Sequence, residues 1–340
     1  MVVVTRSAAT RDALVASFAA QSIDAIALAG STPALLVPHG HDDVAASLRA
    51  HADVVAVYAK APAWPLASTL LSAPRTVSIG GRDGSAPVVV GGTGWTVIAG
   101  PCAVETPAQT ARITDAVVAA GAHALRGGAY KPRTSPYSFQ GLGRTGLELL
   151  AAARAKTGRP VVTEVVSPAD VDAVVGLADC LQIGARNMQN FALLKACGET
   201  KTPVLLKRGF GTTVDELMGS AEHVLAAGNE RVILCERGIR TFENSTRFTL
   251  DVAAIAWLKQ RSCLPVIVDP SHAAGDPAMV VPLALAGLAA GADGLIVEVH
   301  DAPHEAKSDG HQALGVNDFT ALLAKLSALA PALGRTLELR

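Results

Sequence analysis

One stretch of the sequence, residues 125–143 (LRGGAYKPRTSPYSFQGLG), places cations among glycines directly after an apolar run. It holds Arg126, Lys131 and Arg133, and Arg144 follows it. Arginine can bind phosphate or carboxylate with two parallel hydrogen bonds, and backbone N–H groups beside glycine can approach an anion closely. We therefore predict that this segment holds an anionic ligand.

Eight short apolar runs between residues 96 and 300 each end at, or just before, a side chain that can bind a metal, bind an anion or carry a proton. In chain order these side chains are Cys102, Arg126, Glu164, Arg186, Lys207, Arg237, His272 and Glu298. In a barrel of parallel strands the carboxyl ends of the strands surround the active site. We therefore expect all eight groups to lie around one site.

The cations near these strand ends form a first group of candidate site residues. They are Arg126, Lys131, Arg133, Arg186, Lys207 and Arg237. Like charges gathered at one rim repel one another unless anionic ligands neutralise them. The number of cations predicts a ligand set with more than one phosphate group, together with a carboxylate.

A second group consists of Cys102, His272, Glu298 and Asp309, which offer one thiolate, one imidazole and two carboxylates. The first, seventh and eighth strands of a closed barrel are neighbours, and Asp309 falls in the loop after the eighth. These side chains can therefore converge, and they suit a divalent Mn, Fe, Co or Zn ion. The remaining cysteines are interpreted as packing thiols: Cys180, Cys197, Cys235 and Cys263.

The elements that must position these groups alternate regularly from residue 96 onward. Alanine-rich helical segments such as 107–121 and 213–228 separate the eight apolar runs. Nearly continuous apolar strands are typical of parallel sheets covered on both faces, and eight such units predict a (β/α)8 TIM barrel over residues 96–340. An open doubly wound sheet is the fallback, but no G-x-G-x-x-G motif follows a strand. Asp215, Glu222 and Glu230 are interpreted as a solvated helix face.

The first 95 residues lie outside this alternation. Residues 1–60 show strand and helix patterns in the order βαββαβ, which predicts a small ferredoxin-like domain. Because the eight βα units close a barrel without it, this domain is expected to serve regulation or assembly, and a stabilising cap is the alternative. Residues 61–95 are expected to form a linker and then a β-hairpin around Asp83-Gly84.

Charge and cysteine usage exclude several classes of protein. Lys plus Arg number 29 against 30 for Asp plus Glu, so no overall positive charge favours nucleic acid or an anionic membrane. Five cysteines without short paired spacing do not predict a disulfide framework. The N-terminal segment is interrupted by Arg6 and Arg11 and is a poor secretory signal, and the charge-free run 277–292 is too short for a membrane span. A soluble cytoplasmic protein is expected.

Seven segments at the predicted strand ends resemble the motifs of one enzyme family, 3-deoxy-D-arabino-heptulosonate 7-phosphate (DAHP) synthase, type I-beta. They are IAGPCAVE, LRGGAYKPRTSPYSFQGLG, LQIGARNMQN, LLKRG, ILCERGIRTFE, VDPSHAAG and SDGHQAL. The resemblance covers residues 96–330 and extends more loosely to the ferredoxin-like unit. It implies condensation of phosphoenolpyruvate with erythrose 4-phosphate and water to give DAHP and phosphate, which is the first step of the shikimate pathway of aromatic amino acid biosynthesis.

The resemblance also implies roles for single residues. The ligands of the divalent metal ion would be Cys102, His272, Glu298 and Asp309. Phosphoenolpyruvate would be held by Arg126, Lys131, Arg186, Lys207 and Arg237 and by the backbone near Ala185. Erythrose 4-phosphate would be held by Arg133, Thr134 and Ser135. Glu164 would lie near the reacting water, so the expected catalytic residues are Lys131, Glu164 and His272. Members of the family are commonly homodimers or homotetramers.

Two alternatives remain open beside this reading. The sister enzyme, 3-deoxy-D-manno-octulosonate 8-phosphate synthase, performs the same chemistry on arabinose 5-phosphate, but its corresponding segment resembles KANRSS rather than KPRTS. A non-catalytic, ligand-sensing barrel is the other alternative, and the intact candidate ligands and cations tell against it. The loop VHDAPHEAKSDG departs from the family because Asp301-Ala302 replaces a usual proline. We expect this to alter the rigidity of the loop rather than to abolish activity.

Overall fold

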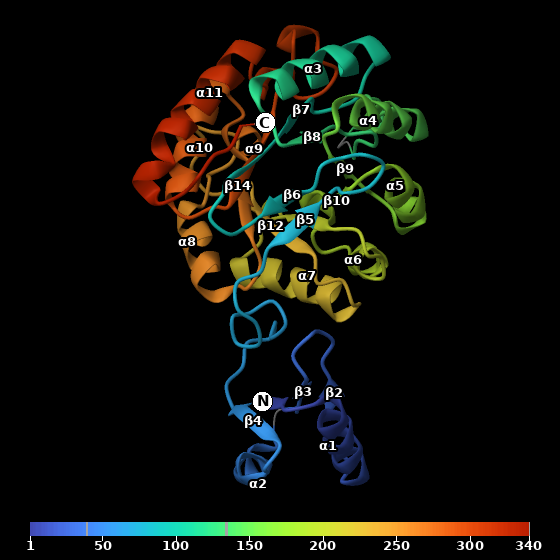
Figure 1. Cartoon of the computed structure of the whole chain (residues 1–340), viewed down its shortest axis with the longest axis vertical. Coiled ribbons are helices and arrows are strands. Elements are labelled where there is room, and N and C mark those ends of the chain that lie inside the picture. The colour runs from blue at the N-terminus through green and yellow to red at the C-terminus, as the bar shows by residue number, and fades with distance from the viewer. Residues whose placement is uncertain (39, 133–134, 340) are drawn as a thin grey trace.

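The computed structural model describes residues 1–38, 40–132 and 135–339. Within these residues, eight parallel strands close into a barrel, with the last strand paired to the first (Figure 1). The strands are β7 (Thr96–Gly100), β8 (Ala124–Arg126), β9 (Val161–Glu164), β10 (Cys180–Ile183), β11 (Val204–Lys207), β12 (Val232–Glu236), β13 (Val266–Val268) and β14 (Gly294–Glu298). They coincide with the eight predicted apolar runs, so the predicted (β/α)8 barrel is confirmed.

Helices surround the barrel and bury its outer face (Figure 1). They are α3 (Pro107–Ala120), α4 (Arg144–Thr157), α5 (Val171–Leu177), α6 (Phe191–Gly198), α7 (Val214–Ala226), α8 (Val252–Arg261), α10 (Pro277–Ala289) and α11 (Val316–Leu329), with the short α9 (Pro270–Ala274) directly after β13. Strand residues that point outward, such as Val97, Leu181 and Val266, belong to the core shared with these helices. Burial of both faces explains why the strands are apolar throughout.

A β-hairpin closes the amino-terminal end of the barrel. Its strands, β5 (Val77–Ile79) and β6 (Val88–Val90), pair antiparallel, as predicted, and Asp83 and Gly84 between them have positive φ angles of 50° and 78°. Val77, Ile79 and Val90 share a buried cluster with the inward-facing barrel residues. Because the hairpin fills this end, the carboxyl ends of the strands form the open end that can receive ligands.

The N-terminal unit forms a separate lobe (Figure 1). Its antiparallel strands lie in the order β2 (Ile26–Ala27), β3 (Ala34–Leu36), β1 (Val2–Thr5), β4 (Val54–Tyr58), with α1 (Ala8–Ala20) and α2 (Ala45–Ala50) between strands in the chain. This is the predicted ferredoxin-like arrangement.

The two faces of the N-terminal sheet are buried differently. Val3 and Leu35 pack with Phe18 and Leu48 of the two helices. On the other face, Val2 and Ala34 belong to a core that also includes Trp64 and Leu66 of the linker. The linker therefore packs against the barrel and is not a flexible connection between two domains.

Acidic side chains of the barrel attach the linker and the N-terminal unit. Glu222 of α7 accepts hydrogen bonds from the backbone N–H groups of Leu66 and Ala67, both at 2.9 Å. Glu230 accepts one from Ser31 N at 2.9 Å. The prediction of a solvated helix face is therefore wrong for Glu222.

None of the helices in the described ranges is long and apolar enough to cross a membrane.

Candidate active site

The carboxyl ends of the barrel strands surround a cavity of about 270 Å³. Nine of the side chains or backbone positions predicted from the sequence line it: Lys131, Ser135, Glu164, Ala185, Arg186, Lys207, Arg237, His272 and Asp309. Cys102, Arg126 and Glu298 are buried and contact these residues or one another. Arg133 and Thr134, predicted to bind erythrose 4-phosphate, lie outside the described residues.

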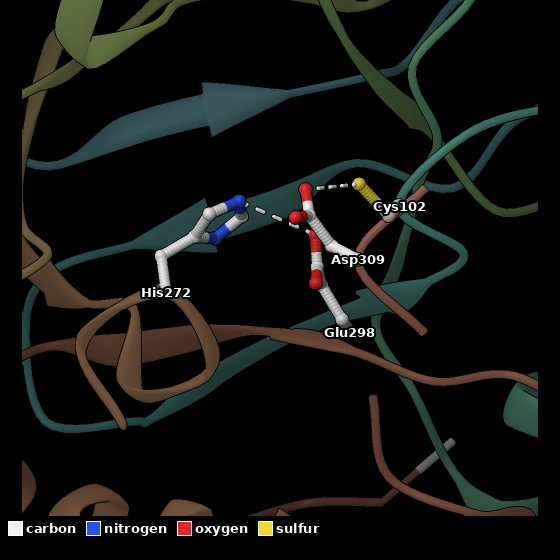
Figure 2. Close-up of side chains that lie close together, drawn as sticks. All are labelled: Cys102, His272, Glu298 and Asp309. Carbon is white, nitrogen blue, oxygen red and sulfur yellow. Dashed lines mark hydrogen bonds and ion pairs between the residues drawn. The ribbon is translucent and has the colours of Figure 1, made fainter. Parts of the chain in front are cut away.

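The four predicted metal ligands converge. One ligand atom from each of Cys102, His272, Glu298 and Asp309 lies within 4.8 Å of the others. The His272 ring points toward the carboxylates, with its Nε2 atom 3.3 Å from Glu298 Oε1, and Cys102 Sγ lies 3.3 Å from Asp309 Oδ2 (Figure 2). They come from the loop after β7, from α9, from β14 and from the loop after β14, so the closed barrel is what joins residues two hundred positions apart.

The chemistry of this donor set fits a divalent metal ion. Glu298 Oε1 is buried and accepts no hydrogen bond from any part of the chain that the structure describes. Its other oxygen accepts one from Gln312 Nε2 at 2.6 Å, which leaves Oε1 directed at the cluster. Nitrogen, sulfur and carboxylate oxygen together suit Mn, Fe, Co or Zn. The cluster could therefore hold such an ion.

The protonation states of the ligands follow from their burial and neighbours. Burial and the Glu298 charge raise the pKa of the Cys102 thiol to about 12, and burial lowers the pKa of His272. Burial disfavours the Asp309 carboxylate, but the charges of Arg247 and Lys131 hold its pKa below the ordinary value. At neutral pH the imidazole thus offers a lone pair and the carboxylates offer charge, while the thiol still carries a proton.

Cations form the second group of residues in the site, beside the four candidate metal ligands. Arg126 is 4% exposed, and its Nη2 atom lies 3.3 Å from Glu298 Oε1. Its Nε and Nη1 atoms are buried and have no hydrogen-bond partner among the described residues. Because buried donors without partners are costly, these atoms indicate that an anionic ligand completes the site. Lys131 links the two groups, since its Nζ atom lies 3.0 Å from Cys102 Sγ.

A pair of stacked phenylalanines supports two of the cations. Phe210 and Phe248 stack with their ring centres 5.2 Å apart. The Arg237 guanidinium lies 4.1 Å from the centre of Phe248, and that of Arg186 lies 5.2 Å from Phe210. Burial lowers the pKa of Arg237 to about 10, and the group stays charged at neutral pH. Cation–π contacts of this kind stabilise a guanidinium that has lost part of its hydration.

Two glycines give the site its shape because a side chain would collide there. A Cβ atom on Gly184 would stand 2.0 Å from Glu164 Oε1, and one on Gly128 would stand 2.7 Å from the Lys131 side chain. Both glycines follow strands, β10 and β8. They allow Glu164 and Lys131 to reach the cavity.

Several site residues were missed by sequence reasoning. Gln182, Phe210 and Arg247 line the cavity, and Arg247 Nη1 lies 2.6 Å from Gln312 Oε1 and 3.3 Å from Asp309 Oδ1. Gln312 falls within the SDGHQAL segment, and its place in that motif is the sequence feature that could have assigned it to the site. Arg247 lies in the long loop between β12 and α8. Because it is far along the chain from the end of β12, its position in the sequence did not indicate that it belongs to the site.

Asp301 connects the loop after β14 to a neighbouring helix. Asp301 Oδ2 accepts a hydrogen bond from Arg112 Nε of α3 at 2.5 Å. This ion pair ties the loop that carries Asp309 to the neighbouring helix.

A family model described as the DAHP synthetase I family matches residues 78–333. The chain belongs to this family. Among the curated proteins, it is 51% identical over 247 residues to phospho-2-dehydro-3-deoxyheptonate aldolase of Thermotoga maritima, which covers 73% of each chain. It is also 34% identical over 251 residues to 2-dehydro-3-deoxyphosphooctonate aldolase of Nitratidesulfovibrio vulgaris, covering 68% of this chain and 91% of that one. The resemblance drawn from the seven motifs is confirmed.

Solved structures of DAHP synthase share the fold. The crystal structure of the T. maritima enzyme matches with a TM-score of 0.79 and 40% identity, over 99% of this chain and 98% of that one. A truncated form of the same enzyme matches with a TM-score of 0.74 and 42% identity, over 81% of this chain and 99% of that chain. Within the family, the greater identity to the heptonate enzyme than to the octonate enzyme makes the sister enzyme the more distant relative.

Proposed function

We propose that this member of the DAHP synthetase I family condenses phosphoenolpyruvate with erythrose 4-phosphate and water, and releases DAHP and phosphate, as the first step of the shikimate pathway. The observation that carries the proposal is the meeting of two sets of residues in one cavity. Four potential metal ligands lie on one side, and cations suited to phosphate and carboxylate lie on the other. Membership of the family supports the same activity.

In this proposal the site requires a divalent ion held by Cys102, His272, Glu298 and Asp309. When bound, the ion would act as a Lewis acid that polarises the aldehyde of erythrose 4-phosphate. Its identity among Mn, Fe, Co and Zn is left open by the donor set.

The cations would hold phosphoenolpyruvate and reduce the cost of bringing two phosphorylated substrates together. The residues proposed for this task are Arg126, Lys131, Arg186, Lys207 and Arg237, with the backbone near Ala185. Carbon 3 of phosphoenolpyruvate attacks the aldehyde carbon, positive charge develops at carbon 2, and water adds there before phosphate leaves. Glu164, whose carboxylate lines the cavity beside Gly184, is proposed to lie near this water.

The aldose phosphate would occupy the other end of the cavity. Ser135 and Ser138 line the cavity, and Arg133 and Thr134 belong to the same KPRTS segment as Ser135, so they remain predicted ligands of erythrose 4-phosphate. A cytoplasmic location and assembly as a homodimer or homotetramer are parts of the same proposal. Five free, buried cysteines support a reducing compartment.

Substrate choice tests the proposal. The enzyme should consume phosphoenolpyruvate and release phosphate with erythrose 4-phosphate, and far more slowly with arabinose 5-phosphate. Coupled phosphate release and mass spectrometry of the seven-carbon product would measure this. Preference for arabinose 5-phosphate would indicate the sister enzyme, and no turnover with either sugar in metal-loaded protein would favour a ligand-sensing barrel.

Metal affinity should rise with pH because the Cys102 thiol must lose its proton to bind an ion. With the pKa of Cys102 near 12 and that of His272 lowered, binding at neutral pH should release about one proton per ion, and the apparent affinity should rise about tenfold per pH unit. Calorimetric titration with Zn²⁺ in buffers of different ionisation enthalpy would count the proton. An affinity that does not change between pH 7 and 8 would contradict the release of a proton from Cys102.

The N-terminal domain, residues 1–60, is proposed to serve regulation or assembly, with inhibition by tyrosine or phenylalanine as one possible form. The barrel is complete without it, whereas Trp64, Leu66 and Ala67 of the linker belong to the barrel's core. Deletion of residues 1–60 should therefore keep these residues, leave measurable turnover and remove any inhibition by an aromatic amino acid that the full chain shows. A truncated protein that folds and binds metal but has no activity would assign the domain a direct part in catalysis.

A further inference from the structure

Asp269 lies between the two groups of site residues and was not singled out in the sequence. It follows β13 directly and is the N-cap residue of α9, the short helix that carries His272. Its side chain is fully buried, with 0% exposure. A buried carboxylate is costly unless cations and hydrogen-bond donors compensate it, so its contacts should reveal what it does.

Three of its hydrogen bonds connect to two site residues. Asp269 Oδ2 accepts from His272 Nδ1 at 2.7 Å and from Lys207 Nζ at 2.5 Å. Asp269 Oδ1 accepts from the backbone N–H of His272 at 3.1 Å. The carboxylate thus holds both the ring and the backbone of His272, and it also holds the ammonium group of a proposed phosphoenolpyruvate ligand.

These contacts select one tautomer of His272. A neutral imidazole that donates from Nδ1 carries its lone pair on Nε2. Nε2 lies 3.3 Å from Glu298 Oε1 and faces the cluster of Cys102, Glu298 and Asp309 (Figure 2). The lone pair therefore points to the place where an ion would bind.

We propose that Asp269 is a positioning residue that fixes the tautomer and direction of His272 for the metal ion, while the ammonium group of Lys207 compensates its buried charge. The inference rests on the proposed metal-dependent function. Carboxylates that accept a hydrogen bond from a metal-bound histidine raise metal affinity by orienting the ring and increasing its basicity.

The role predicts opposite effects of the Asp269→Asn substitution on the two ligands. Metal affinity should fall about 10- to 100-fold, as is usual when such a partner is removed. Phosphoenolpyruvate binding to the metal-free protein should not weaken, because the substitution removes a negative charge beside Lys207 and so reduces repulsion of an anionic ligand. A merely structural role for Asp269 would weaken both.

The barrel offers a matched control at the opposite end of β13. Asp293 is 1% exposed and likewise pairs with a lysine, since its Oδ2 atom accepts from Lys259 Nζ at 2.6 Å and from Val266 N at 2.9 Å. It contacts none of the candidate metal ligands in its described hydrogen bonds. Asp293→Asn therefore makes the same chemical change in a similarly buried carboxylate that pairs with a lysine, away from the site.

The experiment titrates the metal-free full chain and both variants with Co²⁺ and follows thiolate-to-cobalt charge-transfer absorption, and it measures phosphoenolpyruvate affinity by calorimetry. We expect the Co²⁺ dissociation constant of Asp269→Asn to rise about 10- to 100-fold, with no loss of phosphoenolpyruvate affinity. The constant of Asp293→Asn should stay within about threefold of wild type. Unchanged Co²⁺ affinity in Asp269→Asn, or parallel losses for both ligands, would overturn the inference.

Two further measurements distinguish failure of this inference from failure of the proposed metal site and from misfolding of the variant. Absence of the charge-transfer band in the wild-type protein would refute the proposed metal site itself. If Asp269→Asn does not fold, the tautomer of His272 can be read in the wild-type metal-free protein from ¹⁵N-histidine NMR, with His272→Gln used for assignment. A protonated Nδ1 with a bare Nε2 is expected, and the reverse tautomer would overturn the inference.

Discussion

We expect the Cys102→Ala variant to lose at least about a thousandfold in kcat/KM, because a Lewis acid contributes several kcal/mol to such a reaction and each 1.36 kcal/mol is a factor of ten. Cys102 Sγ lies 3.3 Å from Asp309 Oδ2 and 3.0 Å from Lys131 Nζ, so its loss removes a candidate metal ligand that also contacts one of the cations. Steady-state phosphate release with saturating metal would measure the effect.

The matched control for this variant is Cys197→Ala. Cys197 lies in α6 with 0% exposure and is likewise a free thiol, but it is not one of the candidate metal ligands. Both variants remove one buried sulfur, and only Cys102→Ala should lose metal and activity. Equal activity of the two variants would show that Cys102 is not a metal ligand required for activity.

We expect the second large effect from Arg186→Ala, which should raise the KM for phosphoenolpyruvate about 10- to 100-fold. The lost interaction is a charge-assisted hydrogen bond, which is worth about 1.5–3 kcal/mol. The KM for erythrose 4-phosphate should change much less, because that substrate is proposed to bind near Ser135. Arg186 is exposed at the cavity wall, so the fold should tolerate the change, and thermal unfolding would check this.

Arg240→Ala is the control for that measurement. The guanidinium groups of Arg186 and Arg240 lie over the same Phe210 ring, at 5.2 Å and 5.5 Å from its centre. Only Arg186 is among the residues that line the cavity. Equal increases in both KM values for Arg186→Ala, or a similar increase for Arg240→Ala, would contradict the proposed division of the cations.

The sequence predicted most of the barrel and the convergence of the candidate metal ligands for one physical reason. Strands buried on both faces must be apolar, so the first polar group after each run marks the carboxyl end of a strand. Cys102, His272 and Glu298 were found in this way although two hundred residues separate them. The predicted ferredoxin-like unit and hairpin were also visible because alternation and a turn at Asp83-Gly84 are local signals.

The residues that support the site could not be found in this way. Asp269 and Gln312 contact His272 and Glu298, and such contacts depend on side-chain directions that no spacing in the chain encodes. Arg247 approaches the site from the middle of a long loop. Glu222 looked like an ordinary solvated acid of a helix, yet two backbone N–H groups of the linker bind it, because the linker's path is fixed by tertiary packing.

The most direct test of the account is to restore the ion to the chelated full-length enzyme in measured amounts. DAHP formation from phosphoenolpyruvate and erythrose 4-phosphate should be absent after chelation. It should then rise linearly as Mn²⁺, Co²⁺ or Zn²⁺ is added, and level off at about one ion per chain, since the four ligands form one site. DAHP formation at the full rate in protein shown to be free of metal would contradict the account.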